Sequence, residues 1–294
     1  MGKKTLLLSI LIGAIGTSVN LIFTPSLELN PQNLQGKTYL VTGCTPNGIG
    51  YEVAKVLVEW NAKKVVCTMR DEKKSIELKS KLQTQVKRED FSSAFDVEVM
   101  ELTDFESVRS GATRILNKYP KFDGIVLNAG LSLGDQRITK DGFDEVFQVN
   151  HLSQFLLIRL LENHLAQNAR VLFMSSTGYL TGYLDKEAYG KKPGGRKFSS
   201  GSYNHLGVYG DTKLMQVLTA REFSKRFSRK DVSFNSVCPG FVATGFQEKM
   251  GDHIFARIVR FIQMFYARTP PPRGKSTDPS FNGSKVLSTQ WGFR

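Results

Sequence analysis

Short apolar runs and longer amphipathic stretches alternate along most of the chain. Six runs have the length and composition of buried strands. They are residues 38–42, 64–69, 97–102, 124–128, 171–175 and 232–238. Stretches with helical periodicity fill the gaps, among them 51–61, 73–87 and 108–118. Strands that alternate with helices form right-handed crossovers, so the pattern predicts an α/β fold with a doubly wound parallel sheet of six strands in a single domain.

The amino-terminal segment, residues 1–26, has a different pattern. Lys3 and Lys4 precede Thr5–Phe23, a stretch of 19 residues without a charge. This is long enough to cross a bilayer, and a cleaved signal peptide is the alternative. We expect an anchor, because no small-x-small cleavage site lies near its end. The positive-inside rule would send the rest of the chain across the membrane, whereas unpaired cysteines suit the cytosolic face, so the topology stays open.

The rest of the chain divides by composition into a polar linker at 27–35, an α/β domain at 36–275 and an irregular tail at 276–294. Ile254–Arg268 has the period of a basic amphipathic helix, which suits either a lid over a substrate pocket or contact with anionic lipid. Three prolines at 270–272 end any helix there. Too few residues follow to add a helix and a seventh strand, so we expect 232–238 to form a sheet edge.

Charge and cysteine content exclude several classes of protein. The net charge is +13, but no zinc-finger spacing or other nucleic-acid motif accompanies it, so we expect a solvated basic surface and no nucleic-acid partner. The three cysteines lie far apart and form no CxxC pair. We expect neither a disulfide nor a metal site, and we expect reducing surroundings.

The turn after the first predicted strand is rich in glycine. It reads Thr-Gly-Cys-Thr-Pro-Asn-Gly-Ile-Gly over residues 42–50, directly before a predicted helix. Glycine lets the backbone approach a pyrophosphate, whose charge then meets the helix amino terminus. We therefore expect Gly43, Gly48, Ile49 and Gly50 to bind the phosphates of a dinucleotide in a Rossmann-type fold.

Residue 70, at the end of the second predicted strand, is where such folds read the adenosine ribose. An acid there binds a 2′-hydroxyl, and an arginine binds a 2′-phosphate. The residue is Arg70, so we expect NADP(H) as cofactor. Asp71 follows it and keeps NAD as the alternative.

Tyr209 and Lys213 are four residues apart at the start of a predicted helix and share one face. A nearby ammonium would lower the pKa of a tyrosine towards neutrality, which makes the tyrosine a general acid or base. Ser175 and Ser176 follow the fifth predicted strand, and a serine hydroxyl there can donate to a substrate oxygen that gains charge.

Together these motifs resemble the short-chain dehydrogenase/reductase family over residues 36–245. Asn128, Ala129 and Gly130 after the fourth strand, Asn150, and Pro239, Gly240 and Thr244 after the sixth also match its pattern. The stretch from Gly142 to Leu161 is most similar to retinol dehydrogenases and WW-domain oxidoreductases, with some likeness to membrane-bound 3-ketosteroid reductases.

The resemblance implies roles for these residues. Tyr209 is the general acid/base, Lys213 lowers its pKa and holds the nicotinamide ribose, Ser176 polarises the carbonyl, and Asn150 holds a water in a proton relay. The residues implied to bind the cofactor are those of the glycine turn, Arg70, Asn128, Ala129, Gly130, Tyr209, Lys213, Pro239, Gly240 and Thr244, the last against the nicotinamide carboxamide.

We therefore expect an NADP(H)-dependent oxidoreductase that acts on the alcohol or carbonyl of a lipophilic substrate, such as a retinoid, steroid or long-chain aldehyde. We expect it at a membrane, that of the endoplasmic reticulum, with lipid as a partner and a homodimer as its possible assembly.

The alternatives are a carbonyl reductase for a soluble substrate and a catalytically silent, cofactor-sensing scaffold. Two departures favour the latter: the glycine turn has four residues between Gly43 and Gly48, where the family pattern has three, and the chain ends early. A third departure, the 32 residues between Ser176 and Tyr209, indicates a substrate-side loop or a solvated excursion.

Overall fold

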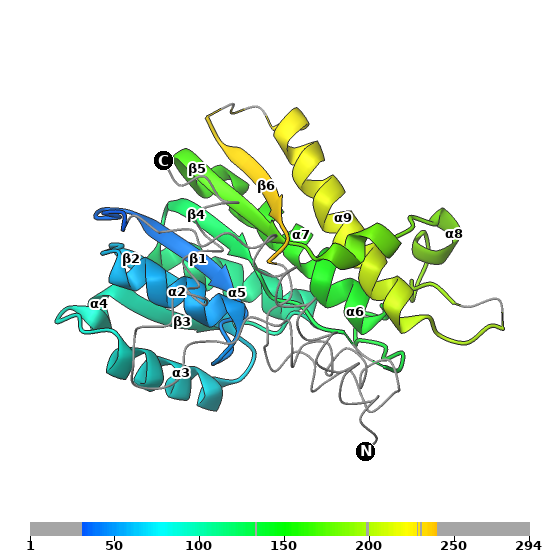
Figure 1. Cartoon of the computed structure of the whole chain (residues 1–294), viewed down its shortest axis with the longest axis horizontal. Helices are drawn as coiled ribbons and strands as arrows, with labels where there is room; N and C mark the ends of the chain where they lie inside the picture. The colour runs from blue at the N-terminus through cyan, green and yellow to red at the C-terminus, as the bar shows by residue number, and fades with distance from the viewer. Residues whose placement is uncertain (1–30, 133, 198–199, 228, 230, 240–294) are drawn as a thin grey trace, which may run out of the picture. The chain divides into compact units, whose positions relative to one another are not determined.

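A computed structural model describes residues 31–132, 134–197, 200–227, 229 and 231–239 of the chain (Figure 1). Six parallel strands form one sheet in the order β3-β2-β1-β4-β5-β6. Their bounds are β1 Thr38–Thr42, β2 Lys64–Met69, β3 Phe95–Val99, β4 Phe122–Leu127, β5 Leu165–Met174 and β6 Ser233–Val237. The strand order reverses between β1 and β4, which is where doubly wound folds bind their ligands. The predicted six-stranded Rossmann-type sheet is confirmed.

Helices cover both faces of this sheet. The longer ones are α2 Ile49–Glu59, α3 Glu72–Gln85, α5 Phe105–Lys118, α7 Ser153–Leu161 and α9 His205–Arg226, and shorter ones are α4 Phe91–Ala94, α6 Glu145–Phe147 and α8 Lys186–Tyr189. A π-helix, η1, spans Gln148–Leu152, and two 3-10 helices, η2 and η3, span Glu162–His164 and Thr177–Thr181.

Alternate strand residues divide the core into two layers, because successive side chains of a strand point to opposite faces. Leu40, Ile125 and Phe173 pack in one buried cluster with residues of α5, α7 and α9. On the other face, α2 lies against β1 and β2 (Figure 1). Burial of apolar side chains on both faces explains why the strands read as continuous apolar runs in the sequence.

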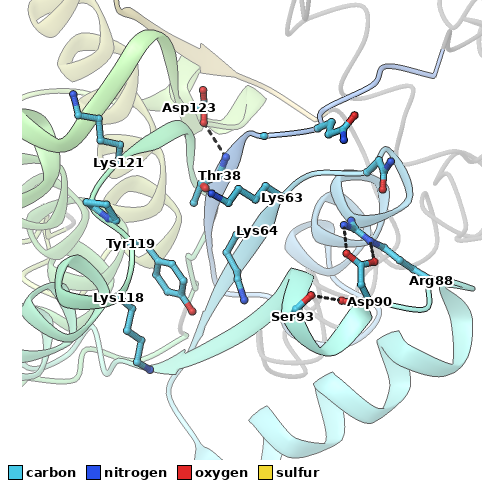
Figure 2. Close-up of a pocket in the computed structure, with 14 residues that line it drawn as sticks. Thr38, Lys63, Lys64, Arg88, Asp90, Ser93, Lys118, Tyr119, Lys121 and Asp123 are labelled. Carbon is cyan, nitrogen blue, oxygen red and sulfur yellow. Dashed lines mark hydrogen bonds and ion pairs between the residues drawn. The ribbon is translucent and has the colours of Figure 1, made fainter.

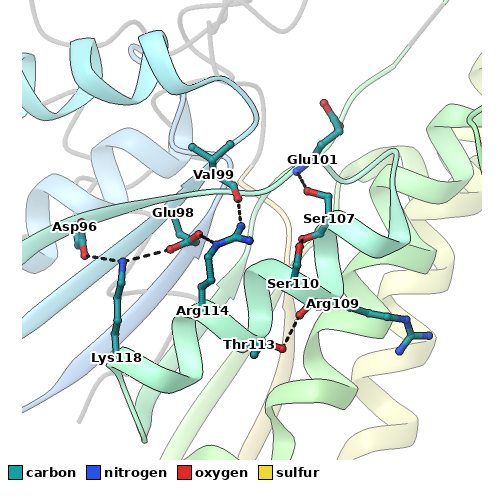
Figure 3. Close-up of polar contacts among 10 residues, drawn as sticks. All are labelled: Asp96, Glu98, Val99, Glu101, Ser107, Arg109, Ser110, Thr113, Arg114 and Lys118. Carbon is teal, nitrogen blue, oxygen red and sulfur yellow. Dashed lines mark hydrogen bonds and ion pairs between the residues drawn. The ribbon is translucent and has the colours of Figure 1, made fainter.

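The third strand begins two residues earlier than predicted and ends at Val99. The prediction left out Phe95 because Asp96 interrupts the apolar pattern, and it continued through Met100 and Leu102, which are apolar but follow the strand. Glu98 is buried, and α5 supplies its charge partners (Figure 3): Arg114 Nε lies 2.5 Å and Lys118 Nζ 3.6 Å from its carboxylate oxygens. Opposite charges from the covering helix allow a carboxylate in a strand, and this pairing is not visible in local sequence periodicity.

The cysteine prediction was wrong. Cys44 and Cys67 form a disulfide, with their Cα atoms 5.9 Å apart, and Cys238 is free. Cys67 lies beside Val41 in the parallel pairing of β2 with β1. The turn at Gly43, whose φ is +71°, brings Cys44 back to that position. Sequence spacing alone did not reveal this, because the two residues become neighbours only through the pairing of the strands.

Several expectations fall on residues outside the described ranges. These are the Thr5–Phe23 anchor, the Ile254–Arg268 helix, the tail at 276–294, and the cofactor contacts of Gly240 and Thr244. Within the described part of the chain, none of the helices has the length and apolar character needed to span a membrane.

Candidate active site at the carboxyl edge of the sheet

Hydrogen bonds join the loop after β1 to the loop after β4. Asn128 Nδ2 donates to the carbonyl oxygens of Thr42 and Gly43 at 2.9 and 3.0 Å. A Cβ on Gly43 would lie 2.8 Å from the Cα of Ala129, and one on Gly50 would lie 2.5 Å from Asn128 Nδ2. These two positions therefore require glycine, and Asn128 acts as the brace that fixes the shape of the loop.

The loop presents the amino terminus of α2 without a side-chain cap. Gly48 is the N-cap residue and makes no capping hydrogen bond, while its carbonyl accepts from the N–H groups of Tyr51 and Glu52. The N–H groups of Ile49 and Gly50 have no acceptor among the described residues. Open N–H groups and the positive end of the helix dipole form an anion site, so the predicted phosphate-binding residues fit a pyrophosphate.

Arg70 and Asp71 follow β2 and have different surroundings. Arg70 is exposed and makes no ion pair within the described ranges. Asp71 is the N-cap residue of α3, and its side chain accepts from the N–H of Lys74 at 2.9 Å. One oxygen of the carboxylate thus caps α3, while the guanidinium is exposed at the end of β2.

Asn150 lies in the π-helix η1 and is fully buried. Its side chain accepts from the N–H of Leu131 at 2.8 Å and donates to the carbonyl of Leu131 and to Thr212 Oγ1. A Cβ on Gly130 would lie 3.3 Å from Asn150 Oδ1 and 3.4 Å from Lys213 Nζ, so these three residues adjoin one another. π-Helical turns are frequent at functional sites, because they redirect a backbone carbonyl out of the usual ladder. Here the carbonyl of Asn150 accepts from Gln216 Nε2 at 2.8 Å.

Two adjacent serines after β5 have different hydrogen-bond partners. Ser175 is buried, and its hydroxyl donates to the carbonyl of Lys213 at 3.0 Å. Ser176 is half-buried, accepts from the N–H of Gly178 at 3.2 Å, and shares a hydrogen bond with Tyr209. The structure therefore brings Ser176, and not Ser175, to the tyrosine.

The pKa of Tyr209 differs from the expectation that Lys213 would lower it. Burial raises the pKa of the Tyr209 hydroxyl above its ordinary 10.0, and the hydrogen bond with Ser176 opposes this rise. Lys213 Nζ lies 5.5 Å from the centre of the tyrosine ring, and donates to the carbonyl of Met174 at 2.8 Å and to Gln216 Oε1 at 3.2 Å. Burial lowers the pKa of Lys213 to about 7. Burial therefore disfavours the charged form of the lysine, and the influence that lowers the pKa of Tyr209 is its hydrogen bond with Ser176.

Asp211 lies between Tyr209 and Lys213 in sequence but serves the long insert. Its fully buried carboxylate accepts from the N–H of Tyr183 at 2.6 Å and from the hydroxyl of Tyr189 at 2.7 Å, and it pairs with Arg196 at 3.0 Å. Three points of the insert are thus held on the helix that carries the catalytic pair. Many of its other described side chains are exposed. Sequence reasoning missed Asp211, although its place within Tyr-x-x-x-Lys was a usable signal.

A free thiol also adjoins the site. Cys238 follows β6, is half-buried, and interacts electrostatically with both Tyr209 and Lys213. Pro239 follows it as the last residue described in this part of the chain. Nothing in the spacing of the cysteines indicated that one of them would lie here, because only the pairing of β6 with β5 brings it next to α9.

Comparison with known proteins identifies the family of this chain. A family model described as short chain dehydrogenase matches residues 37–201, more than half of the 294 residues. Retinol dehydrogenase 14 from Mus musculus is 28% identical over 250 residues, covering 82% of this chain and 72% of that protein. Retinol dehydrogenase 12 from Mus musculus is 32% identical over 227 residues, covering 76% and 67%. Retinol dehydrogenase 13 from Homo sapiens is 29% identical over 222 residues, covering 75% and 63%.

Solved structures share the fold. A dehydrogenase/reductase from Sinorhizobium meliloti superposes with a TM-score of 0.57 at 20% identity, covering 78% of this chain and 81% of that one. A gluconate 5-dehydrogenase from Burkholderia cenocepacia, in complex with NADP and tartrate, gives 0.54 at 20% identity, covering 76% and 78%. At this identity the likeness concerns the architecture alone.

Proposed function

Since this chain belongs to the short-chain dehydrogenase family, we propose that it is an NADP(H)-dependent oxidoreductase acting on the alcohol or carbonyl of a lipophilic substrate. The observation that carries the proposal is the hydrogen bond between Ser176 and Tyr209 beside the buried Lys213. A tyrosine hydroxyl hydrogen-bonded to a serine hydroxyl offers proton chemistry that the binding of cofactor alone does not require.

The residues can perform the proton chemistry of carbonyl reduction. When bound, the cofactor supplies a hydride. Because the pKa of Tyr209 is raised, its hydroxyl is protonated at neutral pH and can donate a proton to the substrate oxygen. Ser176 shares a hydrogen bond with that hydroxyl and can hold the same oxygen. The oxidation of an alcohol would use the reverse proton transfer.

The cofactor assignment rests on Arg70 and Asp71. The exposed guanidinium can form charge-assisted hydrogen bonds with a 2′-phosphate, whereas Asp71 uses one of its oxygens to cap α3. The gluconate 5-dehydrogenase of the same fold was solved with NADP, which accords with this choice.

The lipophilic substrate class is supported by exposed apolar side chains beside the site. Leu180 and Tyr183 are 73% and 62% exposed, in and just after η3, the helix that Ser176 caps. A Cβ on Gly178 in the same helix would lie 3.2 Å from the ring of Tyr209. Apolar surface next to a catalytic tyrosine favours binding of an apolar molecule. The relatives named retinol dehydrogenases point to a retinoid as the first substrate to try.

The test is turnover by the full chain with NADPH and NADH against all-trans-retinal, a 3-ketosteroid, a long-chain aldehyde and a water-soluble ketone. Tyr209→Phe should lower kcat at least about a hundredfold, the usual scale of acid/base assistance, with little change in NADPH affinity. Tyr119→Phe is the matched control, because it removes the same atom from a tyrosine that precedes β4, at the end of the strands opposite the candidate site (Figure 2). NADPH binding without turnover of any of these carbonyls would favour the silent scaffold instead.

We also propose that Thr5–Phe23 anchors the protein in a membrane. Its 19 uncharged residues are the support for this. The full chain should pellet with membranes and resist alkaline carbonate extraction, and a chain that starts at Leu34 should lose that resistance. Full-length protein in the soluble fraction would refute the anchor.

A further inference from the structure

The 3-10 helix η3, Thr177–Thr181, lies directly on the amino-terminal part of α9. A Cβ on Gly210 of α9 would lie 2.5 Å from Thr181 Oγ1 and 2.8 Å from the carbonyl oxygen of Gly178. A Cβ on Gly182, the residue after η3, would lie 2.6 Å from the carbonyl oxygen of Gly210. The two elements therefore meet backbone to backbone at this crossing, without side chains between them.

The same short helix holds Ser176 in place. Ser176 is the N-cap residue of η3: its side chain accepts from the N–H of Gly178 at 3.2 Å, and its carbonyl accepts from the N–H of Tyr179 at 3.0 Å. A Cβ on Gly178 would lie 3.2 Å from the ring of Tyr209. The hydrogen bond between Ser176 and Tyr209 thus joins the start of η3 to α9, and its geometry depends on where η3 lies on that helix.

The carboxylate of Asp211 holds the other end of η3. It accepts from the backbone N–H of Tyr183, two residues after the end of η3, at 2.6 Å. Arg196 Nη2 lies 3.0 Å from the same carboxylate oxygen and donates to the carbonyl of Thr181, the last residue of η3, at 3.1 Å. Asp211 therefore holds the carboxyl end of η3 twice, once through Tyr183 and once through Arg196.

The second carboxylate oxygen of Asp211 is also engaged. It accepts at 2.7 Å from the hydroxyl of Tyr189 in α8, which lies beside α9 (Figure 1). Asp211 is fully buried, and burial raises the pKa of its carboxyl above the ordinary 3.8, although its hydrogen bonds and the charge of Arg196 oppose the rise. Removing this carboxylate would leave the Tyr183 N–H and the Tyr189 hydroxyl without their acceptor, so the segment after η3 would move to find other partners.

Asp211 faces away from the reacting group. It is two residues from Tyr209 and two from Lys213 in α9, so its side chain projects about 200° around the helix from either of them. Its influence on the catalytic pair must therefore pass through η3.

We propose that Asp211 is a positioning residue, which keeps η3 on α9 and so holds the Ser176 hydroxyl within hydrogen-bond distance of Tyr209. The inference rests on the proposed function, in which Ser176 and Tyr209 act on the same substrate oxygen.

The test is a double-mutant cycle, measured as kcat of the full chain with saturating NADPH and the carbonyl that wild type reduces fastest. Ser176→Ala should lower kcat by about a hundredfold, the scale for one lost donor to a reacting oxygen. Asp211→Ala should lower kcat by at least about tenfold, because the serine is then present but displaced. Added to Ser176→Ala, it should cost less than about twofold more, because no serine hydroxyl remains to be positioned.

A merely structural role of Asp211 predicts a different result. The loss caused by Asp211→Ala would then be the same with and without the Ser176 hydroxyl, because independent effects add as free energies. Such additivity would overturn the proposal.

Asp211→Asn is the conservative variant, because its amide oxygen can still accept from the N–H of Tyr183. Its kcat should lie between those of wild type and Asp211→Ala, and if Asp211→Ala does not fold, the same cycle with Asp211→Asn decides. Asp144→Ala is the matched control. It removes another fully buried acid, which accepts from the N–H of Phe147 at 3.0 Å and makes no hydrogen bond to η3 within the described residues. Its effect on kcat should be the same with and without the Ser176 hydroxyl.

Hydrogen exchange of the Gly178 N–H, which donates to Ser176 Oγ, gives a readout that does not need turnover. Asp211→Ala should speed this exchange by about tenfold, the effect of losing one hydrogen bond to a charged group, and Asp144→Ala should leave it unchanged. Exchange at the wild-type rate in Asp211→Ala would overturn the positioning role whether or not the chain is active. Faster exchange in a chain that reduces no carbonyl would refute the proposed function and still support the role of Asp211 in holding η3 on α9.

Discussion

The choice between NADP(H) and NAD(H) depends on two neighbouring residues that the structure places in opposite roles. Replacing Arg70 by alanine should reduce NADPH affinity and leave NADH affinity nearly unchanged, because only NADPH carries the 2′-phosphate. Replacing Asp71 by alanine should leave the affinity for both cofactors nearly unchanged. The pair of substitutions therefore tests the cofactor assignment and its structural explanation together.

The magnitudes follow from the surroundings of each side chain. A hydrogen bond to a charged group contributes about 1.5–3 kcal/mol. Arg70 is exposed, so solvent screens its charge, and the lower end applies: a loss of about 1.5 kcal/mol, or roughly tenfold in NADPH affinity. Removing the Asp71 side chain deletes the hydrogen bond from Lys74 N–H and should cost about 0.5–2 kcal/mol of folding stability instead.

The assay is fluorescence titration of NADPH and NADH with each variant, beside urea unfolding of each. If Arg70→Ala weakens both cofactors alike, the guanidinium supports the loop and does not read the phosphate. If Asp71→Ala improves NADPH over NADH, the carboxylate was an active determinant of selectivity, and its assignment as a helix cap would be insufficient.

Two further predictions concern buried groups. Burial lowers the pKa of Lys213 from 10.5 to about 7, so between these pH values the unfolded chain binds more protons than the folded one. The free energy of unfolding should therefore rise with pH, by a few kcal/mol in total. Unfolding of wild type and Lys213→Met from pH 6 to 10.5 checks this, and an equal dependence of the unfolding free energy on pH in both proteins would contradict it. The disulfide closes a loop of 23 residues in sequence separation, so reductant should lower the free energy of unfolding by about 3 kcal/mol in wild type and leave Cys67→Ala unaffected.

The sequence predicted the fold well where local pattern and tertiary environment agree. The bounds of β1 and β2 match the prediction residue for residue, because both strands are buried on two faces and flanked by turn residues. The strand at Phe95–Val99 was displaced, and it contains the buried Glu98, whose partner Arg114 lies 16 residues further along the chain. A window of neighbouring residues contains no signal for such a partner.

The candidate site shows the same division. Ser176, Tyr209 and Lys213 were predicted together, and the structure brings them together. The charge state of Lys213 was not predictable, because it depends on burial and not on spacing. Asp211 and Cys238 were likewise missed, since their importance arises from an insert and a strand that meet α9 only in three dimensions.

The glycine turn has one residue more than the family pattern, which is the strongest argument against an enzyme. The structure shows where the additional residue is accommodated. The tight contacts lie at the two ends of the turn, where Gly43 meets Ala129 and Gly50 meets Asn128. Between them Thr45 and Asn47 are exposed, and Asn47 adopts a φ of +64°, a conformation that asparagine tolerates. The additional length therefore projects outwards, while both contacts that shape the phosphate site are kept. A turn lengthened in this way can still present the open N–H groups of α2, so the departure is compatible with cofactor binding and gives no independent support to a silent scaffold.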